Sequence, residues 1–145
     1  LHNPNGINGK AITDLFKDSR NNIWIGTYNS GVDLLDRHRK PFEHYQVNFR
    51  ENGLFNNNIR ALFQDSKGAI WVGTKEGGGL SKFNRANGTF ENYKPNENNS
   101  SSLSDDYVLS IEELDANHLL IGTLKKGLDI EPKELFDFEI DFDEN

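Results

Sequence analysis

Short apolar segments separated by polar, glycine-containing turns run along most of the chain, and one of these segments recurs. It reads "IWIGT" at residues 23–27, "IWVGT" at 70–74 and "LLIGT" at 119–123. The segments before the first two copies, "AITDLF" (11–16) and "IRALF" (59–63), are rich in branched and aromatic residues and lead into Asp-Ser turns. Since no stretch of twelve residues shows a 3.6-residue apolar stripe, the pattern predicts short β strands throughout.

Two more strand-like segments follow each of the first two copies. We expect "GVDLLD" (31–36) and "PFEHYQ" (41–46) to be the third and fourth strands of a first unit. "GLSKFN" (79–84) and "TFENYK" (89–94) occupy the same places in a second unit. The segment "DDYVLSIEEL" (105–114) has the composition of a short helix, but it aligns with two strand-like copies and is therefore predicted as a strand.

The repeat keeps a regular register beyond these segments. Gly31, Gly79 and Gly127 are evenly spaced along the chain, and each precedes an apolar residue. A Phe-Glu pair follows each glycine after eleven residues, at Phe42-Glu43, Phe90-Glu91 and Phe138-Glu139. Upstream, Ile7, Leu54 and Leu103 stand five residues before Ile12, Ile59 and Val108. The chain therefore divides into three units, at 1–57, 58–106 and 107–145, and the third is the most divergent because it lacks the tryptophan and the Asp-Ser pair.

A unit of four antiparallel strands in about 48 residues has the size of one β-propeller blade. We therefore predict an all-β fold of three blades. A single four-stranded sheet has two faces to bury, so each blade depends on its neighbours. Trp24 and Trp71 are expected to fill the gaps between blades, together with Phe16, Phe63, Phe42 and Phe90. The remaining structural positions of the repeat are its glycines, namely Gly26, Gly31, Gly73, Gly79, Gly122 and Gly127.

Three blades are fewer than the roughly 4 to 8 with which propellers close. An open stack would leave an apolar face bare at each end. Three arrangements would cover these faces: the chain is a fragment of a larger propeller, it pairs with another chain, or it self-associates. The fragment interpretation is favoured because the sequence does not begin with Met.

Composition removes several classes of partner and chemistry. The net charge is −7 and the pI is near 5.0, with no long basic run, which disfavours nucleic acid and anionic membrane surfaces as partners. No apolar run approaches the roughly 20 residues of a membrane span. The absence of cysteine excludes disulfides, thiolate catalysis and Cys-ligated zinc in this chain.

No motif indicates catalysis, a cofactor or a metal. The sequence contains neither a Gly-x-Ser-x-Gly elbow nor a P-loop, and with 23 acidic residues a chance carboxylate pair carries no weight. The acidic tail (137–145) places Asp141, Asp143 and Asn145 at alternating positions but lacks the glycine and bidentate glutamate of an EF-hand. The histidines are scattered, so no metal site is expected; they are His2, His38, His44 and His118.

Two stretches of the chain resemble a known family of repeats. Residues 59–80, with "LFQDSKGAIWVGT" and a following "GGGL", resemble the two-component regulator propeller repeat, and residues 12–32 do so with Asn22 and Ser30 in place of glycines. In that family such repeats build seven-bladed propellers in the periplasmic sensors of Bacteroides-type hybrid histidine kinases, many of which respond to fragments of complex carbohydrates. The resemblance implies a non-enzymatic, ligand-sensing segment, because the chain carries no kinase or receiver motif.

The loops that lead into each unit are the best candidates for ligand contact. They are rich in Asn, Ser and charged residues, and loops on one rim of a propeller converge near its axis. The candidate residues at this recurring position are Asn8, Lys10, Asn57, Arg60, Asp106 and Tyr107. The alternative is that Asn and Ser here only form turns, through hydrogen bonds from their side chains to the backbone. Trp24 and Trp71 could likewise stack on sugar rings, but their place in the most regular strand favours packing.

Three functions therefore stay open: a carbohydrate-responsive sensor, a propeller-fold polysaccharide lyase or hydrolase, and a protein-interaction scaffold whose end faces recruit a partner.

Overall fold

The structure, a computed structural model, describes residues 6–38, 42–48 and 52–133, and the elements within them are β strands. The first sheet contains β1 (Ile12–Lys17), β2 (Ile23–Thr27), β3 (Val32–Leu35) and β4 (Glu43–Tyr45). The second contains β5 (Ile59–Gln64), β6 (Ile70–Thr74), β7 (Leu80–Asn84) and β8 (Thr89–Tyr93). The third contains β9 (Val108–Asp115), β10 (His118–Thr123) and β11 (Gly127–Pro132).

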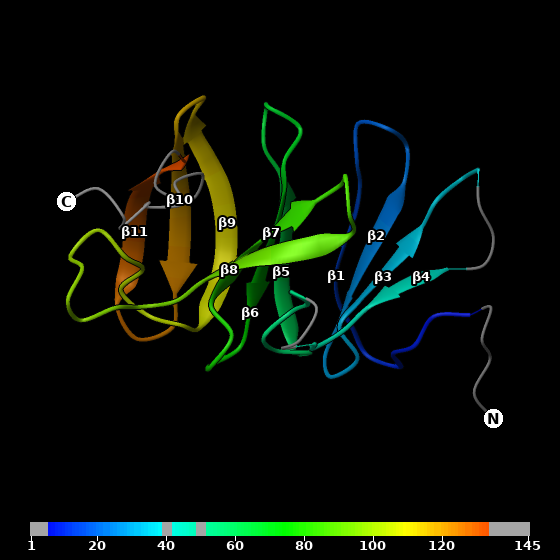
Figure 1. The fold of residues 1–145 in the computed structure, drawn as a ribbon, viewed down its shortest axis with the longest axis horizontal. Coiled ribbons are helices and arrows are strands. Elements are labelled where there is room, and N and C mark those ends of the chain that lie inside the picture. Colours follow the sequence, from blue (N-terminus) through cyan, green and yellow to red (C-terminus); the bar gives the residue numbers. More distant parts are fainter. Residues whose placement is uncertain (1–5, 39–41, 49–51, 134–145) are drawn as a thin grey trace.

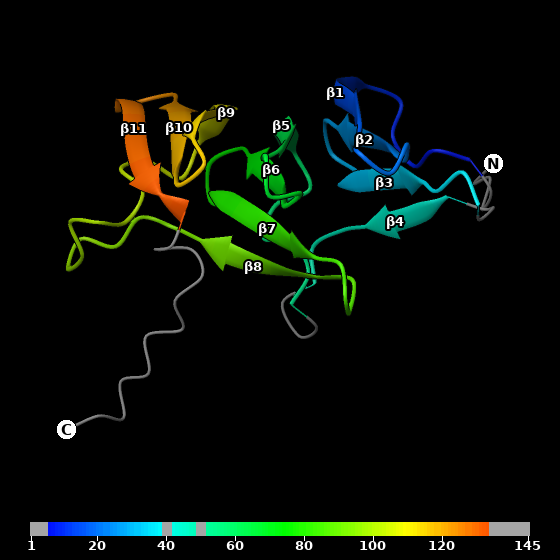
Figure 2. The ribbon, with the colours of Figure 1, turned by 90° about the horizontal axis from the view of Figure 1, so that it is seen from above.

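Each sheet is an antiparallel meander whose strands pair in chain order. The three sheets stand side by side (Figure 1), and the view from above places the first strands β1, β5 and β9 along one edge and β4 and β8 along the other (Figure 2). The prediction of an all-β fold made of propeller blades is confirmed. The predicted unit boundaries fall in the connections between sheets, and the predicted Phe138-Glu139 strand lies outside the described residues.

An aromatic core joins the first sheet to the second. Trp24 is fully buried, and its ring lies edge-on to Phe83 of β7, with 5.0 Å between centroids. Phe83 and Phe90 pack against each other and against Tyr45, which stacks on Trp24 at 6.3 Å. This packing between neighbouring sheets supplies the burial that a lone blade cannot provide.

The second core joins the second and third sheets in the same way. Trp71 is fully buried against aliphatic residues of the third sheet and of the loop before it, which are Leu103, Val108, Ile111, Leu119 and Ile121. Phe16 and Phe63 pack at the margins of the first and second cores. Phe42 belongs to neither, in contrast to the prediction; β4 begins one residue later, and Tyr45 fills the place beside Trp24 instead.

Two repeat glycines are required by the turn that leads into the third strand. Gly31 and Gly79 have φ of +79° and +78°, a region that side chains disfavour. A Cβ at Gly79 would also clash with the carbonyl oxygen of Tyr93 in β8. Each glycine N–H donates to the segment that leads into the next sheet, Gly31 to the carbonyl of Asn57 and Gly79 to that of Asp106.

The outer faces of the first and third sheets are apolar and open. Leu15 in β1 is 60% exposed, whereas the residues aligned with it, Leu62 and Ile111, are buried against the preceding sheet. On the far side Leu128 and Ile130 of β11 are 61% and 57% exposed. Among the described residues, none forms a helix with the length and apolar character to cross a membrane.

Candidate functional site

A β-bulge near the start of the first strand of each sheet turns one side chain out of the regular pattern. In β5 Ile59 pairs with Thr74 and Ala61 with Gly73, so Arg60 is the additional residue. The other two sheets show the same irregularity at Thr13 and Leu109. Bulges of this kind re-aim a side chain and occur next to binding sites.

Arg60 lies between two tyrosines from the neighbouring sheets. Its Nη2 donates to the hydroxyl of Tyr107 at 2.7 Å. Its guanidinium carbon lies 5.8 Å and 5.6 Å from the ring centroids of Tyr28 and Tyr107, within cation–π range. Tyr28 follows β2, Arg60 stands in β5 and Tyr107 precedes β9, so each sheet contributes one member. We name Tyr28, Arg60 and Tyr107 the Arg60 cluster.

The Arg60 cluster has unused hydrogen-bonding capacity and an open side. The Nε of Arg60 is buried and has no hydrogen-bond partner within the part of the chain that the structure describes. Tyr28 is 42% exposed, whereas Tyr107 is buried. The arrangement places the exposed ring of Tyr28 beside the partly buried guanidinium of Arg60 at one rim, and it can accept a polar ligand with an apolar face.

Three of the other residues predicted for this rim hydrogen-bond to other parts of the chain. Asn57 accepts the backbone N–H of Val47 on Oδ1 at 2.7 Å. Asn8 uses its backbone N–H to reach Asp33, and Asp106 uses its carbonyl to bind Gly79. Lys10 is exposed. The structure thus brings Arg60 and Tyr107 together, whereas Asn8, Asn57 and Asp106 hydrogen-bond to Asp33, Val47 and Gly79 elsewhere in the chain.

Sequence reasoning missed Tyr28. It directly follows "IWIGT", at a position where the other units carry Lys75 and Leu124. The aromatic residue at this repeat position was the feature of the sequence that could have indicated it. Its partner Arg60 stands far along the chain and in another sheet, and this separation hid the pair.

The opposite rim is formed by the Asp-Ser turns. The carboxylate of Asp18 accepts the backbone N–H groups of Arg20 and Asn22, and Oδ2 accepts the indole N–H of Trp24 at 2.8 Å. Asp65 repeats this arrangement with Lys67, Ala69 and Trp71. The recurring aspartate therefore closes the turn and satisfies the buried indole at once.

These hydrogen bonds decide the charge state of Asp18. Burial acts to raise the pKa of its carboxyl, but the hydrogen bonds from Trp24, Asn22 and Arg20 outweigh burial and hold the pKa below its usual value. Asp18 is therefore an anion at neutral pH. The next sheet supplies a counter-charge, since Nη2 of Arg85 lies 3.3 Å from Oδ2 of Asp18.

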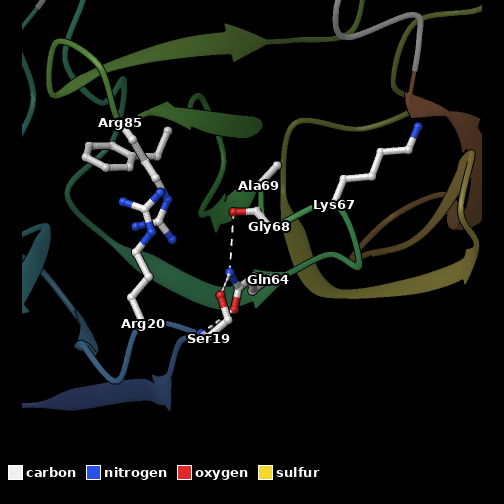
Figure 3. Close-up of a pocket in the computed structure, with 8 residues that line it drawn as sticks. Ser19, Arg20, Gln64, Lys67, Gly68, Ala69 and Arg85 are labelled. Atoms are coloured by element: carbon white, nitrogen blue, oxygen red, sulfur yellow. Dashed lines mark hydrogen bonds between the residues drawn. The ribbon is translucent and has the colours of Figure 1, made fainter.

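A cavity of about 450 Å³ opens between the first and second sheets at this rim. Its lining includes Ser19, Arg20, Gln64, Gly68 and Arg85. Figure 3 shows the side chains of Arg20 and Arg85 pointing toward one another, while Lys67 points away from them toward the third sheet. Gln64 bridges the two turns, because its Nε2 donates to Ser19 Oγ and to the carbonyl of Gly68.

Within the described residues no group of three or more histidine and acidic side chains could hold a metal ion. His44 lies 2.6 Å from Asp33 across β3 and β4, and Ser81 pairs with Asn92 at the same place in the second sheet. This His-Asp contact is therefore a structural cross-strand pair of the repeat. His38 and His118 stand apart from it; His2 and the acidic tail lie outside the described residues.

Two stretches of the chain match the family of the two component regulator propeller, residues 6–29 and 53–76. Each match runs from the lead-in loop through the first two strands of a sheet, and both include the Asp-Ser turn and the "IWxGT" segment. The third unit lies outside both matches. No curated protein matches the chain in sequence.

Solved structures of similar fold come from bacterial extracellular and surface proteins. The extracellular domain of the putative hybrid two-component system BT3049 from B. thetaiotaomicron has a TM-score of 0.78 at 22% identity over 90% of this chain. That of BT4673 from the same organism gives 0.73 at 21% identity over 88%. PorZ, a surface component of the type-IX secretion system of Porphyromonas gingivalis, gives 0.63 at 16% identity over 90%. The chain spans only 18%, 17% and 21% of these three chains.

Proposed function

Because the chain carries two-component regulator propeller repeats, we propose that it is a ligand-sensing segment of the periplasmic part of a hybrid two-component sensor. In this proposal the segment itself is no enzyme, and histidine kinase chemistry belongs to other parts of the receptor. Support comes from the fold shared with the extracellular domains of two such systems.

The ligand in this proposal is an oligosaccharide, and the Arg60 cluster is its contact site. The observation that carries it is the convergence of Tyr28, Arg60 and Tyr107 from three different sheets at one rim. An aromatic ring offers a flat apolar surface to the C–H face of a pyranose, and a guanidinium donates to hydroxyl or carboxylate oxygens. A ligand that bridges the sheets would favour one relative arrangement of the blades over another, which is the differential affinity that a sensor needs.

Calorimetry with the receptor ectodomain and a set of plant and host glycan fragments tests this function. We expect Arg60→Gln to weaken glycan binding by about tenfold or more, since a hydrogen bond to a charged group contributes about 1.5–3 kcal/mol. Tyr28→Ala should weaken binding by a similar factor, because it removes the aromatic surface for the sugar. Lys17→Gln is the matched control, because Lys17 is an exposed cation at the other end of β1. Binding that survives both cluster variants would contradict the site, and glycan cleavage during the titration would favour the lyase or hydrolase interpretation.

A protein-interaction role is the second candidate. The exposed apolar side chains on the two end faces favour it, with Leu15 on one face and Leu128 and Ile130 on the other. The partners of these faces in this proposal are further propeller blades or a second copy of the chain.

A further inference from the structure

The two sheet interfaces use the same contact between an Asp-Ser turn and the far end of the next sheet's first strand. In the first interface the backbone N–H of Ser19 donates to Oε1 of Gln64 at 2.8 Å. In the second, the N–H of Ser66 donates to Oε2 of Glu113 at 2.6 Å. Gln64 in β5 and Glu113 in β9 occupy equivalent positions, so a neutral amide and a carboxylate alternate at one position of the repeat.

In the second interface a buried lysine of the same chain balances the charge of the Glu113 carboxylate. Lys133, only 3% exposed, places its Nζ 3.2 Å from Glu113 and 3.6 Å from Asp65. The hydrogen bond from Ser66 and the charge of Lys133 also lower the pKa of Glu113. One buried cation therefore faces two carboxylates.

The first interface has the opposite balance of charge. Arg85 stands one repeat before Lys133 and contacts Asp18 at 3.3 Å, and Gln64 beside it offers no negative charge. The lining adds a second guanidinium, that of exposed Arg20, and contains no carboxylate. Gln64 and Arg85 take the places of Glu113 and Lys133 here, and an open cavity of about 450 Å³ lies beside them. Two arginines thus line a cavity in which Gln64 stands where the second interface has a carboxylate.

We propose that the cavity between the first two sheets binds an anionic group, a carboxylate or a sulfate, held by Arg20 and Arg85 beside Gln64, so that the ligand brings the negative charge that Glu113 provides in the second interface. Guanidinium groups bind such oxyanions in a planar, bidentate geometry with two parallel N–H···O hydrogen bonds. Figure 3 shows both arginine side chains directed into the same space. Lys67 is not a ligand in this arrangement, since its Nζ reaches Asn117 Oδ1 at 3.4 Å.

This anion site is independent of the proposed sugar site. It lies at the rim of the Asp-Ser turns, at the opposite ends of the strands from the Arg60 cluster. The anion can come from two sources that share one chemistry, a free inorganic ion or an acidic substituent on a sugar. A failure here leaves the Arg60 cluster untouched, and Arg60→Gln is expected to leave anion binding unchanged.

The two buried indoles provide an internal readout. Trp24 is linked to the cavity through Asp18 and Arg85, whereas Trp71 is linked to Lys133 and Glu113 through Asp65. We would titrate the ¹⁵N-labelled chain with sodium sulfate, glucuronate, glucose 6-sulfate and neutral glucose at constant ionic strength. Sulfate and both acidic sugars should shift the Trp24 indole resonance in a saturable manner and leave that of Trp71 in place.

The decisive variant is Gln64→Glu, because it installs the carboxylate that the second interface already tolerates. It should keep the spectrum of a folded chain and weaken anion binding at least about tenfold, through the added like charge. Arg20→Gln should weaken binding similarly, and Lys126→Gln, an exposed cation elsewhere, should not. Tighter binding of the acidic sugars than of sulfate assigns the site to a glycan substituent, and binding of sulfate alone assigns it to an inorganic anion. Equal shifts of both indoles, no saturable shift, or binding that survives Gln64→Glu would overturn the proposal.

Discussion

The Asp-Ser turn and the tryptophan are one structural unit at the scale of single residues. The carboxylate of Asp18 or Asp65 satisfies an indole N–H that would otherwise be buried without a partner. The third unit has Leu114 in place of the aspartate and Leu120 in place of the tryptophan. Both members of the pair are thus absent from the third sheet, where Leu114 is 50% exposed on the open end face.

Removal of a repeat tryptophan should destabilise the chain far more than removal of a rim asparagine. Trp71→Ala deletes a fully buried side chain together with its hydrogen bond to Asp65, and the expected cost is about 3–5 kcal/mol. Asn57→Ala deletes one hydrogen bond to the N–H of Val47, worth about 1 kcal/mol. Thermal melts followed by circular dichroism compare the two, and equal decreases in Tm would contradict the packing described for Trp71.

Glu131 should make stability fall as the pH rises toward neutrality. Burial, aided by the nearby negative charge of Asp129, raises the pKa of Glu131 to about 7 from a usual 4.5. The folded chain therefore binds a proton that the unfolded chain releases between these values, and its stabilising effect is present below pH 4.5 and is lost as the pH passes 7. From pH 5 to 8 the loss should be on the order of 2 kcal/mol, at about 1.4 kcal/mol per pKa unit.

Urea unfolding of the parent and of Glu131→Gln at several pH values measures this contribution. The Gln variant cannot ionise, so its stability should change less between pH 5 and 8 and should exceed that of the parent at pH 8. A parallel pH dependence in the two proteins would show that Glu131 does not carry the effect.

At the scale of strands, the role of a repeat glycine depends on the neighbouring backbone, as Gly79 beside β8 shows. Gly79 has φ +78° and faces the carbonyl of Tyr93 in β8, so Gly79→Ala combines backbone strain with a clash. Gly127 has φ +83° at the equivalent position, but none of the described residues lies within 4 Å of where its Cβ would be. Gly127→Ala should cost about 1–2 kcal/mol, the strain alone, and Gly79→Ala clearly more. Chemical denaturation of the two variants is the measurement, and equal costs would exclude the contribution of the fourth strand.

Strand positions were largely predictable, whereas side-chain partners were not. The even spacing of the repeat locates Gly31, Gly79 and the segments around them, because a repeat must keep its turns in register. The bulge that re-aims Arg60 leaves no mark in composition, and Phe42 was misplaced because β4 begins only at Glu43. Arg60 contacts Tyr28, and Arg20 lies near Arg85, only because two sheets pack together. These contacts could therefore not be predicted from the sequence.

At the scale of the whole molecule, the two sheets that form an interface contribute different residues to it. The earlier sheet supplies tryptophan and aspartate, and the later sheet supplies a cation, Arg85 in one interface and Lys133 in the next. Arg37 occupies the equivalent position of the first sheet and is exposed. The first sheet thus has the cation of a further interface, but the third, with Leu114 and Leu120, lacks the aspartate and tryptophan.

The open end faces lead us to expect self-association in solution. At micromolar concentration the chain should sediment as species heavier than its 16.5 kDa mass, and Leu15→Lys should shift it toward the monomer by charging one apolar face.

Head-to-tail contact between copies would bring Arg37 of one copy against Leu114 of the other, without the acidic partner that the internal interfaces have. Restoring that partner with Leu114→Asp and Leu120→Trp together should therefore tighten association, and adding Arg37→Leu should reverse the gain. A parent chain that remains a clean monomer would show that these faces do not bind each other, and a double variant that associates no better would show that copies do not meet head to tail.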